Sequence, residues 1–387
     1  MRFIAPIVLV ALAAPAAAPV SAQAPAYNSA APIAFMKDLQ TGRVLFSKEA
    51  DKRIPPASMA KMMSVYVAFK LLKAGEANLG QLVMVRPETW TKWNNQGSTM
   101  FLSVNEQVSV ENLLHGIVTL SGNDACVVLA EGLGGTEANY VALMNREAAR
   151  LGLKGSHFTN TNGWPDPNEY VTARDLAMVA EATVRDFPEL YARFYQKQGF
   201  TWGKTMGGGQ AITQGNRNPL LGKIAGADGL KTGHTEEAGY GFTGSAVQNG
   251  RRIVMVVAGL GSFGERVSAS VDFMNWGFGA WQNLPLGKKG QVMGKVAIAG
   301  AAETSIDAAA GKELFVTVPR GFAMERKTSV ESLPGLTAPL KAGSHVGNLV
   351  VTIPGQAPVK APLVTPVAIE EAGVFRRAWN WLMSLFG

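Results

Sequence analysis

The sequence predicts an α+β protein in which helices pack on an antiparallel sheet, followed by a small all-β domain and a final amphipathic helix. Alternating apolar and polar residues mark strands at about 32–50, and three further segments read as strands at about 228–260, beyond a helical middle. Strands from the two ends of one region are best paired in a single sheet that the intervening helices cover. After Leu284 the pattern changes to short strands bounded by glycine and proline.

The first 24 residues are typical of a signal peptide. Arg2 precedes an apolar stretch, rich in alanine, valine and leucine, that runs to about Val20. Prolines interrupt this stretch, which argues against a permanent membrane span. Small residues offer cleavage after Ala22 or Ala24. We therefore expect an exported mature protein.

Residues 25–284 contain the predicted sheet and its helices. Two strands, IAFMKDL and GRVLFSKEA, precede Pro55-Pro56, and the next segment reads as a long helix, apolar around much of its circumference, that belongs inside the domain. Further helices are expected over 110–151 and after the loop FTNTNGWPDPN, where Thr172 and Asp175 resemble a capping box.

Three more strands and a helix complete this domain. The strands are GLKTGHT, AGYGFTGSAV and RRIVMVVAGL, and Asn249-Gly250 joins the last two as a hairpin turn. A helix from Arg266 to about Trp281 follows them. Because strands occur at both ends of the region, we expect one shared antiparallel sheet.

The C-terminal part predicts a β-rich domain over 285–370 and an anchor over 371–387. The segment VFRRAWNWLMSLFG, wound as a helix, has Arg377, Asn380 and Ser384 on one side and large apolar residues on the others. It is too short to cross a bilayer, so we expect an interfacial helix on a membrane surface. A terminal helix docked on its own protein is the alternative.

Composition excludes some classes of function. Of 387 residues, 47% are hydrophobic and 17% charged, as in a folded globular protein of two or three domains. The net charge is +7, but no basic cluster is interleaved with aromatic residues, so we expect no nucleic-acid partner. The lone Cys126 allows no internal disulfide, and its apolar neighbours indicate a buried side chain.

Motifs for zinc and for triad hydrolases are missing from the sequence. It contains neither H-E-x-x-H nor G-x-S-x-G, and His115, His157, His234 and His345 lie far apart. We therefore expect no metal and no cofactor.

Ser58 and Lys61 are a candidate nucleophile and base. A spacing of three residues puts both side chains on one helical face, close enough to hydrogen-bond. A lysine near a helix N-terminus, with its stem in apolar surroundings, can lose its proton near neutral pH and accept the proton of a serine. By itself the pair is also explained by a helix cap and a surface charge.

Two further motifs favour the catalytic interpretation. Ser121-Gly122-Asn123 lies at a break between helices, where polar side chains can point into a cleft. Lys231-Thr232-Gly233 lies on a predicted strand edge, which suits an extended peptide and its carboxylate, and the glycine lets a substrate backbone approach.

In this order, S-x-x-K, S-x-N and K-T-G resemble the active-site motifs of penicillin-binding proteins and serine β-lactamases. The longer stretches PASMAKMM, LSGNDA and DGLKTGHTEEAGY resemble the D-alanyl-D-alanine carboxypeptidase branch, as does a β-rich domain followed by an amphipathic anchor. The resemblance covers nearly the whole mature chain, and it implies the penicillin-binding fold for residues 25–284.

The resemblance implies an acyl-enzyme mechanism. Ser58 would attack the carbonyl between two terminal D-alanines of a peptidoglycan stem pentapeptide, and Lys61 would take its proton. Ser121, held with Asn123 beside Lys61, would pass the proton to the departing D-alanine. Penicillins would acylate the same serine. The enzyme would work at the periplasmic face of the cytoplasmic membrane.

The resemblance also implies a substrate-binding strand. Lys231 and Thr232 would hold the terminal carboxylate, beside Gly233. The backbone N–H groups of Ser58 and His234 would form the oxyanion hole. Arg266 would add positive charge near the carboxylate or lie solvated on its helix.

Three alternatives stay open from the residues alone: a D,D-endopeptidase on peptidoglycan cross-links, a serine β-lactamase, and a silent wall-binding protein. The β-lactamase is disfavoured because GWPDPNEY, with Asp166 and Glu169, lacks the E-x-x-L-N pattern of the class A enzymes. Ser103-Val104-Asn105 is a second S-x-N, but Ser121 has the helix-break context and the family-like continuation.

Overall fold

The structure is a computed structural model that describes residues 24–204, 209–322, 327–354 and 357–373. The chain divides into two compact units, one of Pro25–Pro285 with Phe315–Thr317, and the other of Leu286–Leu314 with the chain from Val318 onward. The expected signal peptide and nearly all of the expected anchor helix lie outside the described residues. In the part that is described, no helix has the length and apolarity needed to cross a bilayer.

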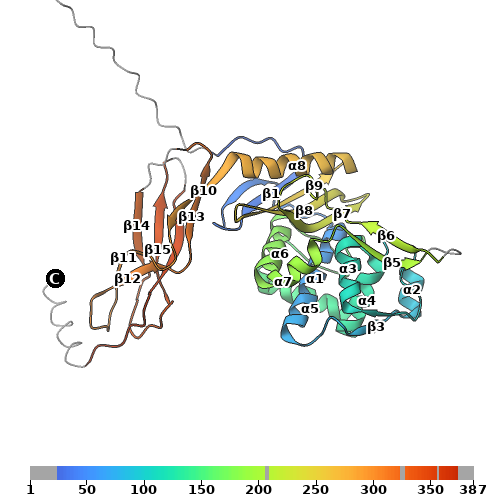
Figure 1. Ribbon diagram of the computed structural model, residues 1–387, viewed down its shortest axis with the longest axis horizontal. Helices are drawn as coiled ribbons and strands as arrows, with labels where there is room; N and C mark the ends of the chain where they lie inside the picture. The colour runs from blue at the N-terminus through green and yellow to red at the C-terminus, as the bar shows by residue number, and fades with distance from the viewer. Residues whose placement is uncertain (1–23, 205–208, 323–326, 355–356, 374–387) are drawn as a thin grey trace, which may run out of the picture. The chain divides into compact units, whose positions relative to one another are not determined.

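The first unit is built on a five-stranded antiparallel sheet (Figure 1). Its order is β2 (Val44–Lys48), β1 (Ile33–Asp38), β9 (Arg251–Leu260), β8 (Gly239–Gln248) and β7 (Ala227–Thr235). Strands from the two ends of the domain pair directly, since β1 lies beside β9. The prediction of one shared sheet is confirmed.

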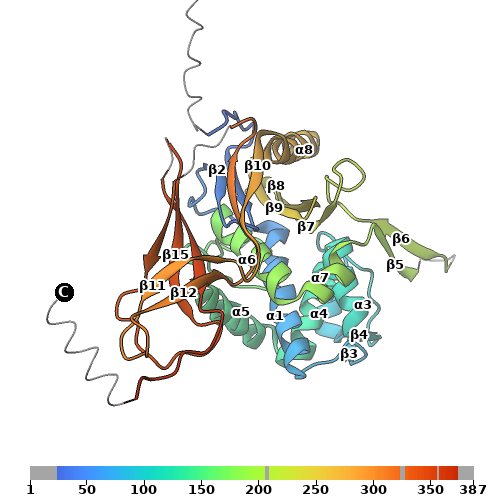
Figure 2. The same ribbon diagram turned by 60° about the vertical axis from the view of Figure 1, so that its left-hand side comes forward.

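Helices cover both faces of this sheet (Figures 1 and 2). Helix α8 (Phe263–Ala280) lies on one face, while α6 (Ala173–Asp186) and α1 (Lys61–Ala74) lie on the other. Alternation along β9 explains this layering. Val254 and Val256 belong to the core shared with the helical layer, and Met255 packs into the core beneath α8.

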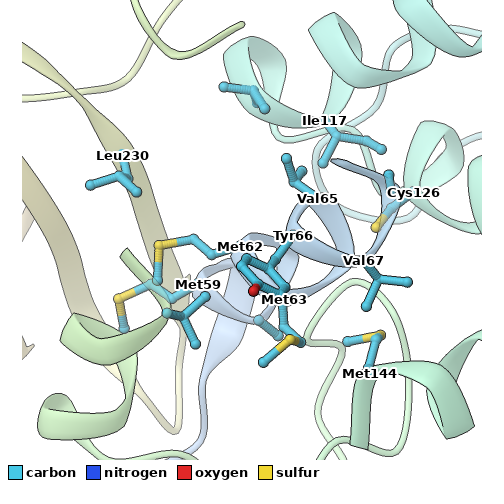
Figure 3. Close-up of a cluster of buried hydrophobic side chains, with 14 of the residues drawn as sticks. Met59, Met62, Met63, Val65, Tyr66, Val67, Ile117, Cys126, Met144 and Leu230 are labelled. Atoms are coloured by element: carbon cyan, nitrogen blue, oxygen red, sulfur yellow. The ribbon is translucent and has the colours of Figure 1, made fainter. Parts of the chain in front are cut away.

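Helix α1 runs through the centre of the helical layer, with its first nine residues buried. Figure 3 shows Met59, Met62 and Met63 beside Tyr66 among apolar side chains from neighbouring elements. Before it, η1 (Ala57–Ala60) forms a separate 3₁₀ turn. The predicted helix thus begins later as an α-helix than its apolar pattern indicates, because Ala57 has a positive φ of 46° that a right-handed helix cannot contain.

The remaining elements of this unit extend the helical layer. The helices, with the π-helical turn η2, are α2 (Pro87–Trp93), α3 (Val110–His115), η2 (Gly116–Leu120), α4 (Asn123–Gly134), α5 (Glu137–Leu151) and α7 (Pro188–Tyr195). Thr172 caps α6 by accepting a hydrogen bond from the backbone N–H of Asp175, as the capping box predicts. Two small antiparallel pairs that the sequence analysis did not predict are β3 (Leu82–Met84) with β4 (Gln107–Ser109), and β5 (Gly199–Lys204) with β6 (Ala211–Gly215).

The second unit is all-β in its described residues, as predicted. Its five-stranded sheet has the order β11 (Val292–Ala297), β12 (Ser305–Ala310), β16 (Val359–Val364), β15 (His345–Thr352) and β14 (Lys327–Ser332). Two further strands, β10 (Trp281–Gly287) and β13 (Leu314–Pro319), pair with each other, and their parts Trp281–Pro285 and Phe315–Thr317 belong to the first unit.

Candidate active site

A cleft of about 520 Å³ brings the three predicted motifs together. It is lined by the turn η1, which carries Ser58, the start of α4, strand β7, the loop of residues 162–164 and the start of α8. Of the predicted site residues, those lining it are Ser58, Ser121, Asn123, Thr232, Gly233 and His234. Lys61 and Lys231 are buried beside it.

The Lys61 amine links the motifs by three hydrogen bonds. Its Nζ donates to Ser58 Oγ at 2.8 Å, to Asn123 Oδ1 at 2.7 Å and to the backbone oxygen of Asn162 at 2.7 Å. Ser58 lies in η1 and Lys61 is the first residue of α1, so the three-residue spacing does place the pair in contact. Three acceptors suit an ammonium group, and the Ser58 hydroxyl can donate back once the lysine is neutral.

Burial adjusts the acidity of Lys61. Its side chain is fully buried, and this burial lowers the pKa of Lys61 to about 8. The nearby Cys126, Glu169 and Asp124 act in the opposite direction and raise it, while Arg217 lowers it. With a pKa of about 8, about a tenth of the molecules carry the free amine at pH 7. The group is therefore suited to take a proton near neutral pH.

The Ser121–Asn123 motif is held at the junction of η2 and α4. Ser121 has a left-handed φ of 66° and is buried, and Asn123 begins α4. Asn123 Nδ2 donates to the backbone oxygen of Gln96 at 2.8 Å, which leaves Oδ1 for Lys61. A Cβ at Gly122 would lie 2.9 Å from Asp124 Oδ1, so the middle position of this motif has room only for glycine.

The Lys231–Gly233 motif lies on β7, the end strand of the sheet. The structure shows a further reason for its glycine. A Cβ at Gly233 would lie 3.0 Å from the Pro56 backbone oxygen, 3.1 Å from Met59 Cγ and 3.2 Å from Ala57 Cβ. The missing side chain therefore lets β7 approach η1, the turn that carries Ser58.

Basic side chains surround Lys231 on β7. Burial holds the pKa of Lys231 well below its usual range, and the charges of Lys61, Arg217 and Arg266 lower it further. Arg266 is buried on α8, lines the cleft and has Nη1 3.4 Å from the Gly233 backbone oxygen. The interpretation of Arg266 as a solvated helix residue is therefore wrong. The His234 ring lies against Tyr240, with 3.8 Å between the ring centroids.

Sequence reasoning missed three residues of the site. Asn162 supplies a backbone oxygen to Lys61, Arg217 lines the cleft and donates to Ser98 Oγ at 2.5 Å, and Trp164 forms part of the wall. The loop composition around Asn162 and Trp164 was visible, but nothing in that composition indicates a contact with Lys61. Arg217 lies more than 150 positions along the chain from Ser58, outside any recognised spacing.

The second S-x-N sequence and the lone cysteine lie outside the cleft lining. Ser103 is exposed and Asn105 belongs to the same turn, away from the cleft lining. Burial raises the pKa of the Cys126 thiol to about 11, as expected for an unreactive cysteine. In the described ranges, no group of three or more His, Cys, Asp and Glu residues is placed to hold a metal ion.

Comparison with known proteins agrees with this arrangement. Residues 18–262 match the family described as D-alanyl-D-alanine carboxypeptidase, and residues 281–371 match the C-terminal domain of penicillin-binding protein 5. The D-alanyl-D-alanine carboxypeptidase DacA of Haemophilus influenzae is 35% identical over 90% of this chain and 87% of its own length. The enzyme DacC of Escherichia coli is 35% identical over 96% of this chain and 91% of its own.

Solved structures give the same result. Penicillin-binding protein 5 of Haemophilus influenzae superposes with a TM-score of 0.80 at 33% identity, over 90% of this chain and 99% of that one. Penicillin-binding protein D2 of Listeria monocytogenes, in an ampicillin-bound form, has a TM-score of 0.56 at 27% identity, over 66% of this chain and 99% of that one. The site and these matches agree that the chain belongs to the D-alanyl-D-alanine carboxypeptidase family of low-molecular-mass penicillin-binding proteins.

Proposed function

We propose that Ser58 is the nucleophile of this serine-type D-alanyl-D-alanine carboxypeptidase and that Lys61 is its general base. The observation that carries the proposal is the 2.8 Å hydrogen bond between Lys61 Nζ and Ser58 Oγ, made by a lysine whose burial lowers its pKa to about 8. As the Ser58 oxygen attacks the carbonyl between the two D-alanines, its proton passes to Lys61.

The second half of acylation needs a proton donor. The C–N bond of the tetrahedral intermediate breaks, and the amine of the leaving D-alanine takes a proton from Lys61, with the Ser121 hydroxyl as relay. Support comes from the position of Ser121 on the cleft wall and from Asn123, which accepts a hydrogen bond from Lys61. Water then attacks the ester on Ser58, releasing the shortened peptide and returning the proton to Ser58.

Strand β7 binds the substrate in this proposal. Thr232 and Lys231 hold its terminal carboxylate, with Arg266 adding charge from α8, and the backbone N–H groups of Ser58 and His234 stabilise the oxyanion. The end position of β7 and the presence of Thr232, Gly233 and His234 on the cleft wall support this. Peptidoglycan stem peptides are the substrates and β-lactams the covalent inhibitors of the family.

Export and membrane attachment form the remaining part of the proposal. Residues 1–24 direct export, and residues 371–387 bind the periplasmic face of the cytoplasmic membrane as an interfacial helix. The apolar run with small residues at its end supports the first statement, and the arginine and tryptophan pattern of VFRRAWNWLMSLFG supports the second.

Mass spectrometry tests the central claim. The protein is incubated with a labelled penicillin and digested, and a covalent adduct is expected on the peptide containing Ser58. Absence of that adduct in the wild type, or an unchanged adduct in Ser58→Ala, contradicts the nucleophile assignment. Release of D-alanine from a pentapeptide reports the carboxypeptidase reaction itself.

Membrane fractionation tests the anchor. A chain that ends at Gly373 is expected in the soluble fraction, whereas the full chain is expected to sediment with vesicles that contain anionic lipid. If the shortened chain stays with the vesicles, the tail is not the anchor.

A further inference from the structure

We propose that Glu169 is a positioning residue for the Lys61 base, acting through Asn160 and the loop of residues 160–164. The inference rests on the proposed function, since it assigns a support to the general base. The reaction described above does not use Glu169, and its sequence context predicts only a loop.

Glu169 is a buried carboxyl group with one oxygen engaged. The residue is only 4% exposed. Oε2 accepts a hydrogen bond from Asn160 Nδ2 at 2.5 Å. Oε1 is buried and has no hydrogen-bond partner among the residues that the structure describes. A buried carboxyl group with an unpartnered oxygen is unfavourable for folding, which points to a role other than stability.

Asn160 organises the loop that follows it. Its Oδ1 accepts from three successive backbone N–H groups, those of Asn162 at 3.2 Å, Gly163 at 2.7 Å and Trp164 at 3.0 Å. This is possible only when Nδ2 points away from those groups, toward an acceptor. Glu169 Oε2 is one such acceptor, and the others are the Trp164 backbone oxygen, at 2.9 Å, and Thr159 Oγ1, at 3.5 Å. Glu169 therefore helps to set the orientation of the Asn160 amide.

The same loop bears directly on the catalytic pair. The backbone oxygen of Asn162 accepts a hydrogen bond from Lys61 Nζ. At Gly163, which has a φ of 77°, a Cβ would lie only 1.8 Å from the Ala57 backbone oxygen, so the loop is pressed against the turn that carries Ser58. A displacement of the loop thus moves an acceptor of Lys61 and disturbs the turn that holds the nucleophile.

Charge couples Glu169 to Lys61 as well. Burial raises the pKa of Glu169 to about 8; Asp166 raises it too, and Lys61 lowers it. In return, an ionised Glu169 raises the pKa of Lys61. The other groups that act on the Lys61 amine are Cys126, Asp124 and Arg217, and Lys231 and Lys61 repel each other. Removing the charge of Glu169 should therefore lower the pKa of Lys61 and favour the free amine.

Two substitutions separate positioning from charge. In Glu169→Gln, an amide oxygen can still accept from Asn160, but the negative charge cannot form. We expect this variant to acylate within about threefold of the wild-type plateau rate and to shift the acid limb of the pH profile to lower pH. In Glu169→Ala both functions are lost, and we expect the plateau rate to fall by about tenfold or more.

The measurement is the second-order rate of acylation by a labelled penicillin between pH 5.5 and about 9.5. This range includes the pKa values of about 8 of Lys61 and Glu169. Thermal denaturation of each variant verifies folding. Asp166→Asn is the matched control, because Asp166 lies on the same loop and its carboxyl accepts from Asn168 and not from Asn160. Losing the charge of Asp166 lowers the pKa of Glu169, and the ionised Glu169 raises the pKa of Lys61. Asp166→Asn should therefore leave the acid limb of the pH profile in place or move it to higher pH.

Three results would overturn the inference. They are an unchanged acid limb in Glu169→Gln, an equal downward shift in Asp166→Asn, and a wild-type plateau rate in Glu169→Ala. A failure of the proposed function is distinguishable from these, because it would appear as a wild-type enzyme without an adduct on Ser58.

Discussion

Asp124 accepts a hydrogen bond at 2.8 Å from the backbone N–H of Met100, which joins the start of α4 to the loop before β4. The same carboxyl accepts from Thr99 Oγ1 at 2.6 Å and from the Leu102 N–H at 3.3 Å. Because Asp124 follows Asn123 directly, this junction also fixes the amide that contacts Lys61. The S-x-N motif is thus supported by the residue that comes after it.

Loss of this junction should destabilise the protein. Asp124→Ala leaves several buried donors unpaired, and we expect the free energy of unfolding to fall by about 3 kcal/mol. Urea denaturation measures this. Glu88→Ala, at an exposed residue in the first turn of α2, is the control and should change stability by less than about 0.5 kcal/mol. Equal stabilities of Asp124→Ala and the wild type would show that the junction is not structural.

The pH dependence of acylation should follow Lys61. Its pKa of about 8 predicts an acylation rate that rises with pH, is half-maximal near that value and reaches a plateau above it. Lys61→Arg keeps a cation that stays protonated, so we expect a flat pH profile about a thousandfold below the wild-type plateau. Stopped-flow acylation with a chromogenic β-lactam gives both profiles. A profile in Lys61→Arg that still rises with a midpoint near 8 would assign the titration to another group.

The close approach of β7 to η1 should make Gly233 intolerant of a side chain. Gly233→Ala places a methyl group 3.0 Å from the Pro56 backbone oxygen, so strand and turn must separate. We expect acylation to slow by about tenfold. Gly279→Ala on α8 is the control, because a Cβ there meets nothing within 4 Å, and its acylation rate should equal that of the wild type. A wild-type rate in Gly233→Ala would mean that the turn adapts freely.

Arg266 should contribute to recognition of a free terminal carboxylate. Arg266→Ala is expected to raise KM for a peptide ending in D-Ala-D-Ala by about tenfold, with a smaller effect on the same peptide as its C-terminal amide. Arg266→Lys retains the charge and should fall between Arg266→Ala and the wild type. Steady-state kinetics with both peptides decides this. An equal loss on the acid and the amide would indicate a packing role for Arg266 against Tyr240.

The sequence predicted those parts of the molecule that depend on local pattern. The segments read as strands became β1, β8 and β9, and Ser58 and Lys61 were close enough along the chain for their contact to follow from helical spacing. The short pairs β3–β4 and β5–β6 were missed because three to six residues carry too little periodicity. Arg217 and the backbone oxygen of Asn162 were missed because only tertiary packing brings them to the cleft.

Some glycines are required by local backbone conformation, and others by close tertiary contacts. The pair Asn249-Gly250 has positive φ values of 50° and 76°, as a two-residue hairpin requires, and this was readable from the letters. The crowding at Gly122 comes from the distant Met100 as well as from the nearby Asp124, and the crowding at Gly233 comes from η1, far away in the sequence. No local rule indicates such crowding.

The complete burial of Lys61 sets catalysis against stability. Folding moves its pKa from 10.5 down to about 8, so below pH 8 the folded protein must hold a proton that the unfolded chain binds more favourably. This difference destabilises the fold by about 3 kcal/mol at neutral pH and disappears as the pH rises to about 10.5. Unfolding by urea at pH 7 and pH 9.5 should show a larger gain in stability with pH for the wild type than for Lys61→Met. At neutral pH, the burial of Lys61 therefore lowers the free energy of unfolding of the protein.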